Sequence, residues 1–158
     1  MKYILLLMLI IINLIAKEVD VDIQADYFEA NKQKNIVLFK GKVSMIKGTD
    51  TLTSDKLEVY TRLNKDTNKT MAYQYIATGK VRFTVTKPTT LLIGKGDKVV
   101  YKVDDNVYTI TGNGYLEDKN ASKIVMGDKI YINNNTGETK IEGKANAPVK
   151  FKFKMLAK

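Results

Sequence analysis

The sequence predicts an all-β domain built from repeated hairpins, and three observations support this prediction. From Val19 onward apolar residues alternate with polar ones, which is the period of a half-buried strand. No segment of this part shows the 3.6-residue apolar stripe and capping residues of a helix. A sequence motif, in which a small residue and an aspartate precede an apolar strand, occurs four times. We therefore interpret the chain as repeats of one structural unit.

Each unit is typical of a hairpin. A first strand follows the aspartate, a turn rich in asparagine and aspartate comes next, and a second strand leads to a glycine. The four units run from Asp26 to Gly41, from Asp55 to Gly79, from Asp97 to Gly112 and from Asp128 to Gly143. Their predicted turns are residues 31–35, 64–68, 104–106 and 133–137. The aspartate-to-glycine distance is 15 residues in all units except the second, where a nine-residue insertion around residues 65–71 makes it 24.

The alternation sorts the side chains of these strands onto two faces. One face is apolar from Phe28 in the first unit to Ile141 in the last, whereas the other carries lysines and threonines such as Lys42 and Thr111. Two such sheets can close face to face into a sandwich, or one sheet can curl into an open trough. The recurring glycines suit bends or bulges. We expect the recurring aspartates at the margin of the apolar face, where they accept hydrogen bonds from turn amides.

The composition excludes most catalytic and metal sites. The 158 residues include no cysteine and no histidine, which removes disulfides, thiol nucleophiles, iron–sulfur clusters, Ser–His–Asp triads and the usual zinc sites. One aspartate per repeat is also a poor match to the single carboxylate pair of a glycosidase. We therefore predict that the chain is not an enzyme and has no metal and no cofactor. Its net charge of +9 favours a polyanionic partner or surface.

The first sixteen residues predict export. Lys2 is followed by an apolar run over residues 4–15 and by Ala16, the pattern of a secretory signal peptide. The run is shorter than the roughly 20 residues that span a bilayer. We predict cleavage after Ala16, which makes residues 17–158 a single domain. An uncleaved inner-membrane anchor stays open as an alternative, because residues 14–16 fit the cleavage pattern poorly. For an exported protein we expect no nucleic-acid partner.

Two motifs resemble a known family. Ile110-Thr111-Gly112-Asn113-Gly114-Tyr115-Leu116 and Met126-Gly127-Asp128-Lys129-Ile130-Tyr131 are similar to segments of the LptA/OstA-type lipopolysaccharide-transport proteins. Those proteins also have a secretory signal, no helical body and strand repeats marked by glycine and aspartate. The resemblance covers roughly Val19 to Val149. It implies a twisted, V-shaped antiparallel β-jellyroll, built from repeated hairpins, whose apolar interior carries the lipid A part of lipopolysaccharide.

The resemblance also implies a role and partners. It implies a periplasmic protein that passes lipopolysaccharide from the inner to the outer membrane, joined head to tail to its own copies and to inner-membrane LptC-like and outer-membrane LptD-like jellyrolls. Shielding is needed because one acyl chain of about a dozen methylenes costs roughly 10 kcal/mol in water. The candidate lipid-binding residues are Phe28, Val37, Phe39, Val43, Met45, Leu57, Val59, Val81, Phe83, Val99, Tyr101, Ile110, Leu116, Met126, Ile130, Ile132 and Ile141. Lysines at the open rim would lie near the phosphates of the cargo.

Two other interpretations remain open at this point. An LptC-like jellyroll anchored in the inner membrane would belong to the same pathway and would keep residues 1–16. A structural β-sandwich of the cell envelope would carry no lipid, because its apolar face would be a closed, dry core.

The two ends of the domain predict how copies join. The candidate assembly edges are strands with one apolar face, formed by Val19, Val21 and Ile23 at the start and by Val149, Phe151 and Phe153 at the end. Their polar faces carry opposite charge, with Glu18, Asp20 and Asp22 against Lys150, Lys152 and Lys154. Pairing of start to end is therefore favoured over pairing of like ends. The alternative is that these charges only protect both edges from aggregation.

Overall fold

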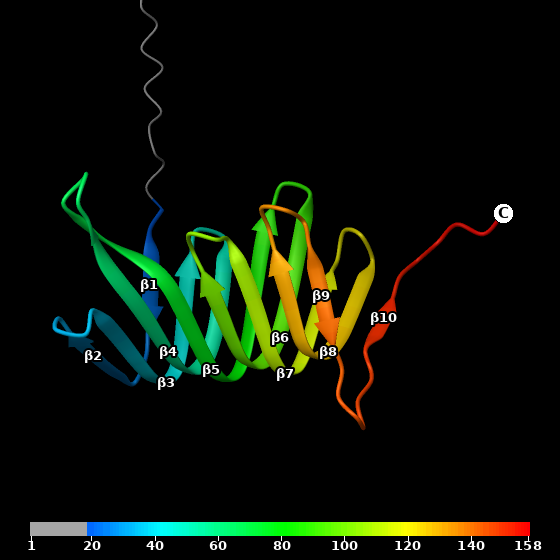
Figure 1. Cartoon of the computed structure of the whole chain (residues 1–158), viewed down its shortest axis with the longest axis horizontal. Coiled ribbons are helices and arrows are strands. Elements are labelled where there is room, and N and C mark those ends of the chain that lie inside the picture. The colour runs from blue at the N-terminus through cyan, green and yellow to red at the C-terminus, as the bar shows by residue number, and fades with distance from the viewer. Residues whose placement is uncertain (1–18) are drawn as a thin grey trace, which may run out of the picture.

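The computed structural model describes residues 19–158, and these form one antiparallel sheet that is folded over lengthwise (Figure 1). The predicted signal segment and Glu18 lie outside the described residues. The strands are β1 (Val21–Gln24), β2 (Tyr27–Asn31), β3 (Ile36–Lys47), β4 (Asp50–Asn64), β5 (Lys69–Lys87), β6 (Thr90–Lys102), β7 (Val107–Asp118), β8 (Lys123–Asn133), β9 (Thr139–Glu142) and β10 (Lys150–Lys152). The predicted all-β fold of repeated hairpins is confirmed.

Each long strand crosses the fold of the sheet and contributes to two arms. The first arm holds β1, β10 and the segments 43–47, 50–54, 81–87, 90–96, 114–118 and 123–127. The second arm holds β2, β9 and the segments 36–40, 56–64, 69–78, 98–102, 107–111 and 129–133. In Figure 1 the bends run along the lower side of the molecule and most hairpin tips lie at the top. The insertion of the second unit lengthens the hairpin of β4 and β5.

The repeated aspartates and glycines meet at the bends. Register shifts interrupt the strand pairing there, and Gly41, Gly79 and Gly112 have φ angles of 78°, 85° and 78°. A side chain at Gly112 would contact Asp97, since a Cβ placed there lies 2.9 Å from the Cβ of Asp97. Gly41 meets Asp26 and Gly79 meets Asp55 in the same way. In the first three units the aspartate and the glycine therefore mark a contact between neighbouring strands, whereas Gly143 of the fourth unit meets Ala147 and Val149 instead.

The position of these aspartates corrects an expectation. Asp26, Asp55 and Asp97 are exposed on the outside of the bend rather than at the margin of the apolar face. The reason is that the alternation of side chains is interrupted where a strand crosses the bend: Ser54 and Leu57 are both buried, and Asp55 lies between them. The extra residue of each bulge lies on the neighbouring strand. The Asp97 carboxylate accepts a hydrogen bond from the side-chain amide of Asn113, at 3.2 Å, and not from a turn amide.

We expect Gly112→Ala to lower the free energy of unfolding by about 2–4 kcal/mol, because the new methyl group adds overlap with Asp97 to the strain of a positive φ. Gly137→Ala is the matched control, since Gly137 has a φ of 74° and nothing within 4 Å of its Cβ position. Its expected cost is about 1–2 kcal/mol from strain alone. Urea unfolding of both variants measures the difference, and equal costs would contradict the proposed packing of aspartate on glycine.

The hydrophobic core lies where the two arms converge at the bend. Leu57, Ile110 and Ile130 of the second arm have no exposed surface. Opposite them the first arm carries glycines: a side chain at Gly96 would overlap Ile110, and one at Gly127 would overlap Ile141. These glycines let the arms approach closely, so the bend is filled and dry. We call the side chains next to the bend the core row: Val43, Leu57, Ala77, Val81, Val99, Ile110 and Ile130.

Candidate functional site

A second row of apolar side chains lies farther from the bend, and we call it the open row. On each strand its members lie one inward-facing position farther from the bend than the residue next to the bend, and most are only half-buried. In the first arm these are Met45, Leu52, Phe83 and Leu116, and in the second arm Val37, Val59, Tyr75, Tyr101, Tyr108 and Ile132. A cleft of about 300 Å³ opens between the arms, with Met45, Leu52 and Val85 on one wall and Tyr75, Tyr101 and Tyr108 on the other.

Four aromatic rings meet in this cleft. Tyr101 and Tyr108 stack with their centroids 4.2 Å apart and an interplanar angle of 15°. Tyr75 stacks on the other side of Tyr101 at 6.2 Å, so the three tyrosines form a continuous stack along the second arm. Phe83 comes from the first arm and stacks on Tyr108 at 6.2 Å and 17°. The cleft thus has one mainly aliphatic wall and one wall of phenol rings.

Burial in the cleft changes the acidity of two phenols. Burial raises the pKa of Tyr108 far above its ordinary value, and the neighbouring Tyr101 acts in the same direction. Burial also raises the pKa of Tyr75, again with a contribution from Tyr101. Because burial disfavours the phenolate, both groups are neutral at any physiological pH.

These shifts predict a loss of stability at high pH. The pKa of Tyr108 is higher in the folded than in the unfolded chain, so its contribution is fully present below about pH 10 and declines as the pH rises further. We expect the urea midpoint of the wild-type protein to fall between pH 9 and pH 11 (about one unit either side of the ordinary tyrosine value). Tyr108→Phe should show a smaller fall. Equal falls in both proteins would show that Tyr108 is not desolvated.

Polar side chains surround the opening of the cleft. Lys47, Asp50 and Lys87 lie on the rim of the first arm, and Asn106 and Asn134 lie on the rim of the second. The Asp50 carboxylate accepts a hydrogen bond from the backbone N–H of Thr86 at 2.9 Å. Asn106 accepts hydrogen bonds from the Asn134 side chain at 3.2 Å and from the Tyr101 hydroxyl at 3.4 Å. The rim therefore offers two lysine ammonium groups on one side and neutral amides on the other.

The structure divides the predicted lipid-binding residues into several groups. The buried members are Val43, Leu57, Val59, Val81, Phe83, Val99, Ile110 and Ile130. The half-buried members are Val37, Phe39, Met45, Tyr101, Leu116, Ile132 and Ile141. Phe28 is 60% exposed because it lies on the edge strand β2, where it contacts Phe39 at a centroid distance of 5.4 Å. All of these share one face of the folded sheet with the cleft.

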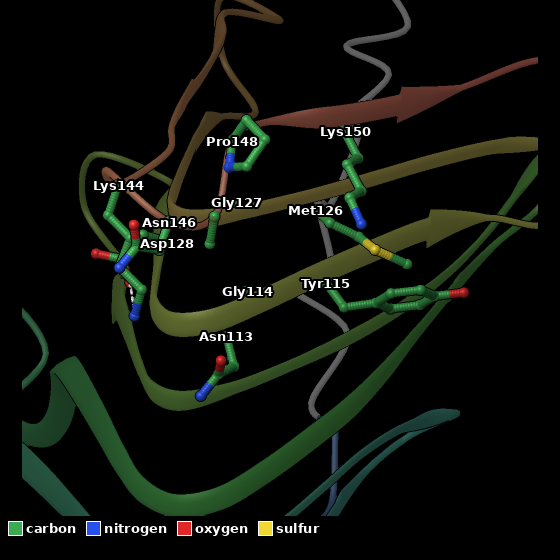
Figure 2. A pocket seen from close by; sticks show the side chains of 11 residues that line it. Asn113, Gly114, Tyr115, Met126, Gly127, Asp128, Lys144, Asn146, Pro148 and Lys150 are labelled. Carbon is green, nitrogen blue, oxygen red and sulfur yellow. Dashed lines mark ion pairs between the residues drawn. The ribbon is translucent and has the colours of Figure 1, made fainter.

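Met126 requires a correction to the predicted lining. It pairs with Tyr115 on one side and with Lys150 on the other, on the outer face of the first arm. Figure 2 shows these three side chains together beside a second cleft, of about 390 Å³, between the bend of β7 and β8 and the segment from Lys144 to Lys150. An ion pair of 3.3 Å joins Lys144 and Asp128 there. The alternation in β8 changes where the strand crosses the bend, since Gly127 and Ile130 both face inward, and this is why Met126 points away from the interior. The extra residue of the bulge lies on the neighbouring strand β7.

Sequence reasoning did not single out three residues that line the inner cleft: Leu52, Tyr75 and Tyr108. A signal was available for the tyrosines, since Tyr75 is two residues from Ala77 and Tyr108 two residues from Ile110, both on the apolar face. Leu52 stands among threonines and a serine, so its segment has little apolar character. Its role becomes evident only from the strand register, which places it between Met45 and Phe83.

Both ends of the folded sheet have unpaired edge strands. At the start these are β1 in the first arm and β2 in the second, and at the end they are β10 and β9. The apolar side chains predicted as assembly edges are mostly exposed there: Val19, Val21, Val149, Phe151 and Phe153 are each 40–54% exposed, whereas Ile23 packs against the core. β2 and β9 were not predicted as edges, because the sequence alone does not reveal that each end has two arms.

Residues 19–158 show neither a metal-ligand cluster nor a membrane-spanning helix. In that part of the chain no three acidic, histidine or cysteine side chains gather as metal ligands would. The same residues contain no helix long and apolar enough to cross a membrane.

Comparisons with known proteins agree with this geometry. The sequence profile of one family, described as LptA/(LptD N-terminal domain) LPS transport protein, matches residues 22–138. The fold is similar to the crystal structure of LptH, described as the LptA homologous periplasmic component of the lipopolysaccharide transport device from Pseudomonas aeruginosa. The TM-score is 0.71 over 86% of this chain and 96% of that chain, with 13% sequence identity. This likeness confirms the predicted V-shaped β-jellyroll. No curated protein matches in sequence.

Proposed function

The chain belongs to the family of LptA and LptD N-terminal domain lipopolysaccharide transport proteins, and from this premise we propose that it is a periplasmic bridge protein. In this proposal the cleft between the two arms shields the acyl chains of lipid A. Copies joined head to tail, together with LptC-like and LptD-like jellyrolls at the two membranes, pass lipopolysaccharide from the inner to the outer membrane. The chain acts by binding and not by catalysis.

The observation that carries the proposal is the incomplete burial of the open row. A closed β-sandwich would bury both inner rows, whereas here Met45, Leu52 and Tyr75 remain half-exposed above a filled core. Each methylene of cargo that covers such a surface contributes about 0.8 kcal/mol. The open row, rather than the core row, is therefore the proposed acyl-chain surface.

The rim of the cleft supports the same cargo. Lys47 and Lys87 lie at the opening above the apolar walls. Neither makes an ion pair within 4 Å in the described part of the chain, so both ammonium groups are available to an anionic headgroup. A molecule with phosphates at one end and several acyl chains at the other matches this division into a cationic rim and an apolar floor.

The topology supports head-to-tail joining. The path from β1 to β10 passes through seven antiparallel pairings, so the two edge strands run in opposite directions. When two copies share one orientation, β10 of one lies antiparallel to β1 of the next. The same holds for β9 and β2. Such a joint continues both arms from copy to copy, and with them the cleft.

Organic extraction and mass spectrometry of the purified protein test this function. The full chain is expressed in a bacterium that makes lipopolysaccharide and is purified from its periplasm. Lipopolysaccharide is expected in the extract of the folded protein. A folded protein that carries none, and that binds none when lipopolysaccharide is added, would contradict the proposal and favour a structural envelope domain.

A further inference from the structure

One contact in the interior crosses from arm to arm above the core. Phe83 belongs to the first arm and Tyr108 to the second, and their rings stack at 6.2 Å and 17°. We call this pair the aromatic bridge. The strands that carry the two rings, β5 and β7, are not neighbours, because β6 lies between them. The bridge therefore runs obliquely along the cleft as well as across it.

The fold provides a seat for the Phe83 ring. In the first arm Phe83 pairs with Gly94, and a Cβ at Gly94 would overlap the atoms of this ring. The missing side chain at Gly94 lets the ring lie over the backbone of β6 and reach Tyr108, and Phe83 is only 7% exposed as a result. If position 94 carried any side chain, that side chain would occupy the space of the Phe83 ring.

The two halves of the bridge are held differently. Tyr108 stacks closely on Tyr101, at 4.2 Å, and the hydroxyl of Tyr101 donates a hydrogen bond to Asn106 on the rim. Phe83 has no polar atom, so packing alone holds its ring. The tyrosine stack is thus held by ring contacts and a hydrogen bond, whereas Phe83 is held by packing alone.

The cleft ends at the aromatic bridge. Its lining extends from Met45 and Leu52 near the start of the chain to Phe83 and Tyr108. Leu116 and Ile132 of the open row lie on the far side of the bridge, together with Val125, which pairs with Leu116. None of the three lines the cleft. The aromatic bridge thus separates the cleft on the side of β3 and β4 from a second apolar stretch on the side of β8, whose Leu116 and Ile132 are likewise half-buried.

We propose that the aromatic bridge is a gate that positions the acyl chains of the cargo. An acyl chain first occupies the compartment beside Leu52, and it reaches Leu116 only when the Phe83 ring leaves Tyr108. This proposal rests on the proposed function, because it assumes that acyl chains enter the cleft. In this proposal the Phe83 ring positions the acyl chains of the cargo, in addition to filling space between the two arms.

A photo-crosslinking experiment compares the two sides of the gate. A photoreactive amino acid replaces either Leu52 or Leu116, which are half-buried members of the open row on opposite sides of the bridge. The purified full chain receives less than one equivalent of lipopolysaccharide and is irradiated. In the wild-type background the adduct at Leu52 is expected to exceed the adduct at Leu116. Loss of the ring in Phe83→Leu should raise the Leu116-to-Leu52 ratio about two- to tenfold, the change that corresponds to one aromatic pair.

Further variants separate the gate from general loosening of the fold. Gly94→Ala keeps both rings but displaces Phe83 from its seat, so it should raise the ratio as Phe83→Leu does. Phe83→Tyr keeps a ring and should leave the ratio unchanged. Tyr60→Leu removes a ring of another aromatic pair, formed with Tyr73 and outside the predicted lining, and should also leave the ratio unchanged. Circular dichroism verifies that each variant is folded.

The adduct ratios distinguish the gate from two alternatives, which are a fold that is merely loosened and a chain that binds no lipid. Equal adducts at Leu52 and Leu116 in the wild-type background, or a ratio that Phe83→Leu does not change, would overturn the gate while leaving lipid binding intact. Adducts at neither position would overturn the gate together with the proposed function. A ratio raised equally by Tyr60→Leu would show that loosening of the fold, and not the bridge, controls the far side.

Discussion

Reversing the charge of β10 with Lys150→Glu and Lys152→Glu is expected to abolish self-association of the chain at low salt. Both lysines lie on the outer face of the first arm, opposite Met126 and Ile124. Asp22 of β1 lies on the outer face of the same arm, opposite Ile46. In a head-to-tail joint these acidic and basic strands face each other. Replacing attraction by repulsion at two such pairs weakens the joint by about tenfold or more.

Two controls make the assembly prediction specific. Adding Asp20→Lys and Asp22→Lys to the reversed protein restores opposite charges and should restore association. Lys98→Glu with Lys102→Glu changes the net charge equally at exposed positions of the central strand β6, and should leave association unchanged. Sedimentation velocity at several protein concentrations measures all four proteins. Failure of the double reversal to restore association, with every variant folded, would refute the charge-matched joint.

Leu52→Asp is expected to reduce lipopolysaccharide binding by about tenfold or more, because it places an unpaired carboxylate against acyl chains. Leu52 lies on the floor of the cleft between Met45 and Phe83, and Asp50 on the rim adds a like charge. Thr53→Asp is the matched control, since the next residue points to the outer face beside Arg82. Binding is measured by titration with fluorescent lipopolysaccharide. Equal losses in the two variants would contradict the assignment of faces.

The sequence predicted the architecture well because the repeat encodes it in spacing. Asp97 and Gly112 are in contact across neighbouring strands, and Asp26 and Gly41 repeat both this contact and its interval. Alternation then indicates the inner face correctly within each straight segment, as it does for Val37 and Phe39. It fails where β4, β6 and β8 cross the bend, because inward-facing residues there are three rather than two positions apart, as Gly127 and Ile130 are. The misplacement of Met126 and of the aspartates has this single cause.

The distinction between core and lining could not be predicted in the same way. Leu57 and Leu52 are the same residue type on one strand, yet Leu57 is completely buried at the bend and Leu52 faces the cleft. The difference is their distance from the bend, which depends on strand register and on the glycines of the opposite arm. The aromatic bridge is equally hidden from sequence, because Phe83 and Tyr108 are brought together only by the folding of the sheet.

The central claim is that lipid occupies the space between the two arms, and crosslinking at adjacent residues tests it most directly. A photoreactive amino acid at Leu52 faces the cleft, and the same group at Thr53 faces outward from the same strand. The proteins are irradiated with lipopolysaccharide, and adducts are detected by immunoblotting and mass spectrometry. We predict a strong adduct at Leu52 and none above background at Thr53. Equal adducts at both positions, or an adduct only at Thr53, would contradict the claim.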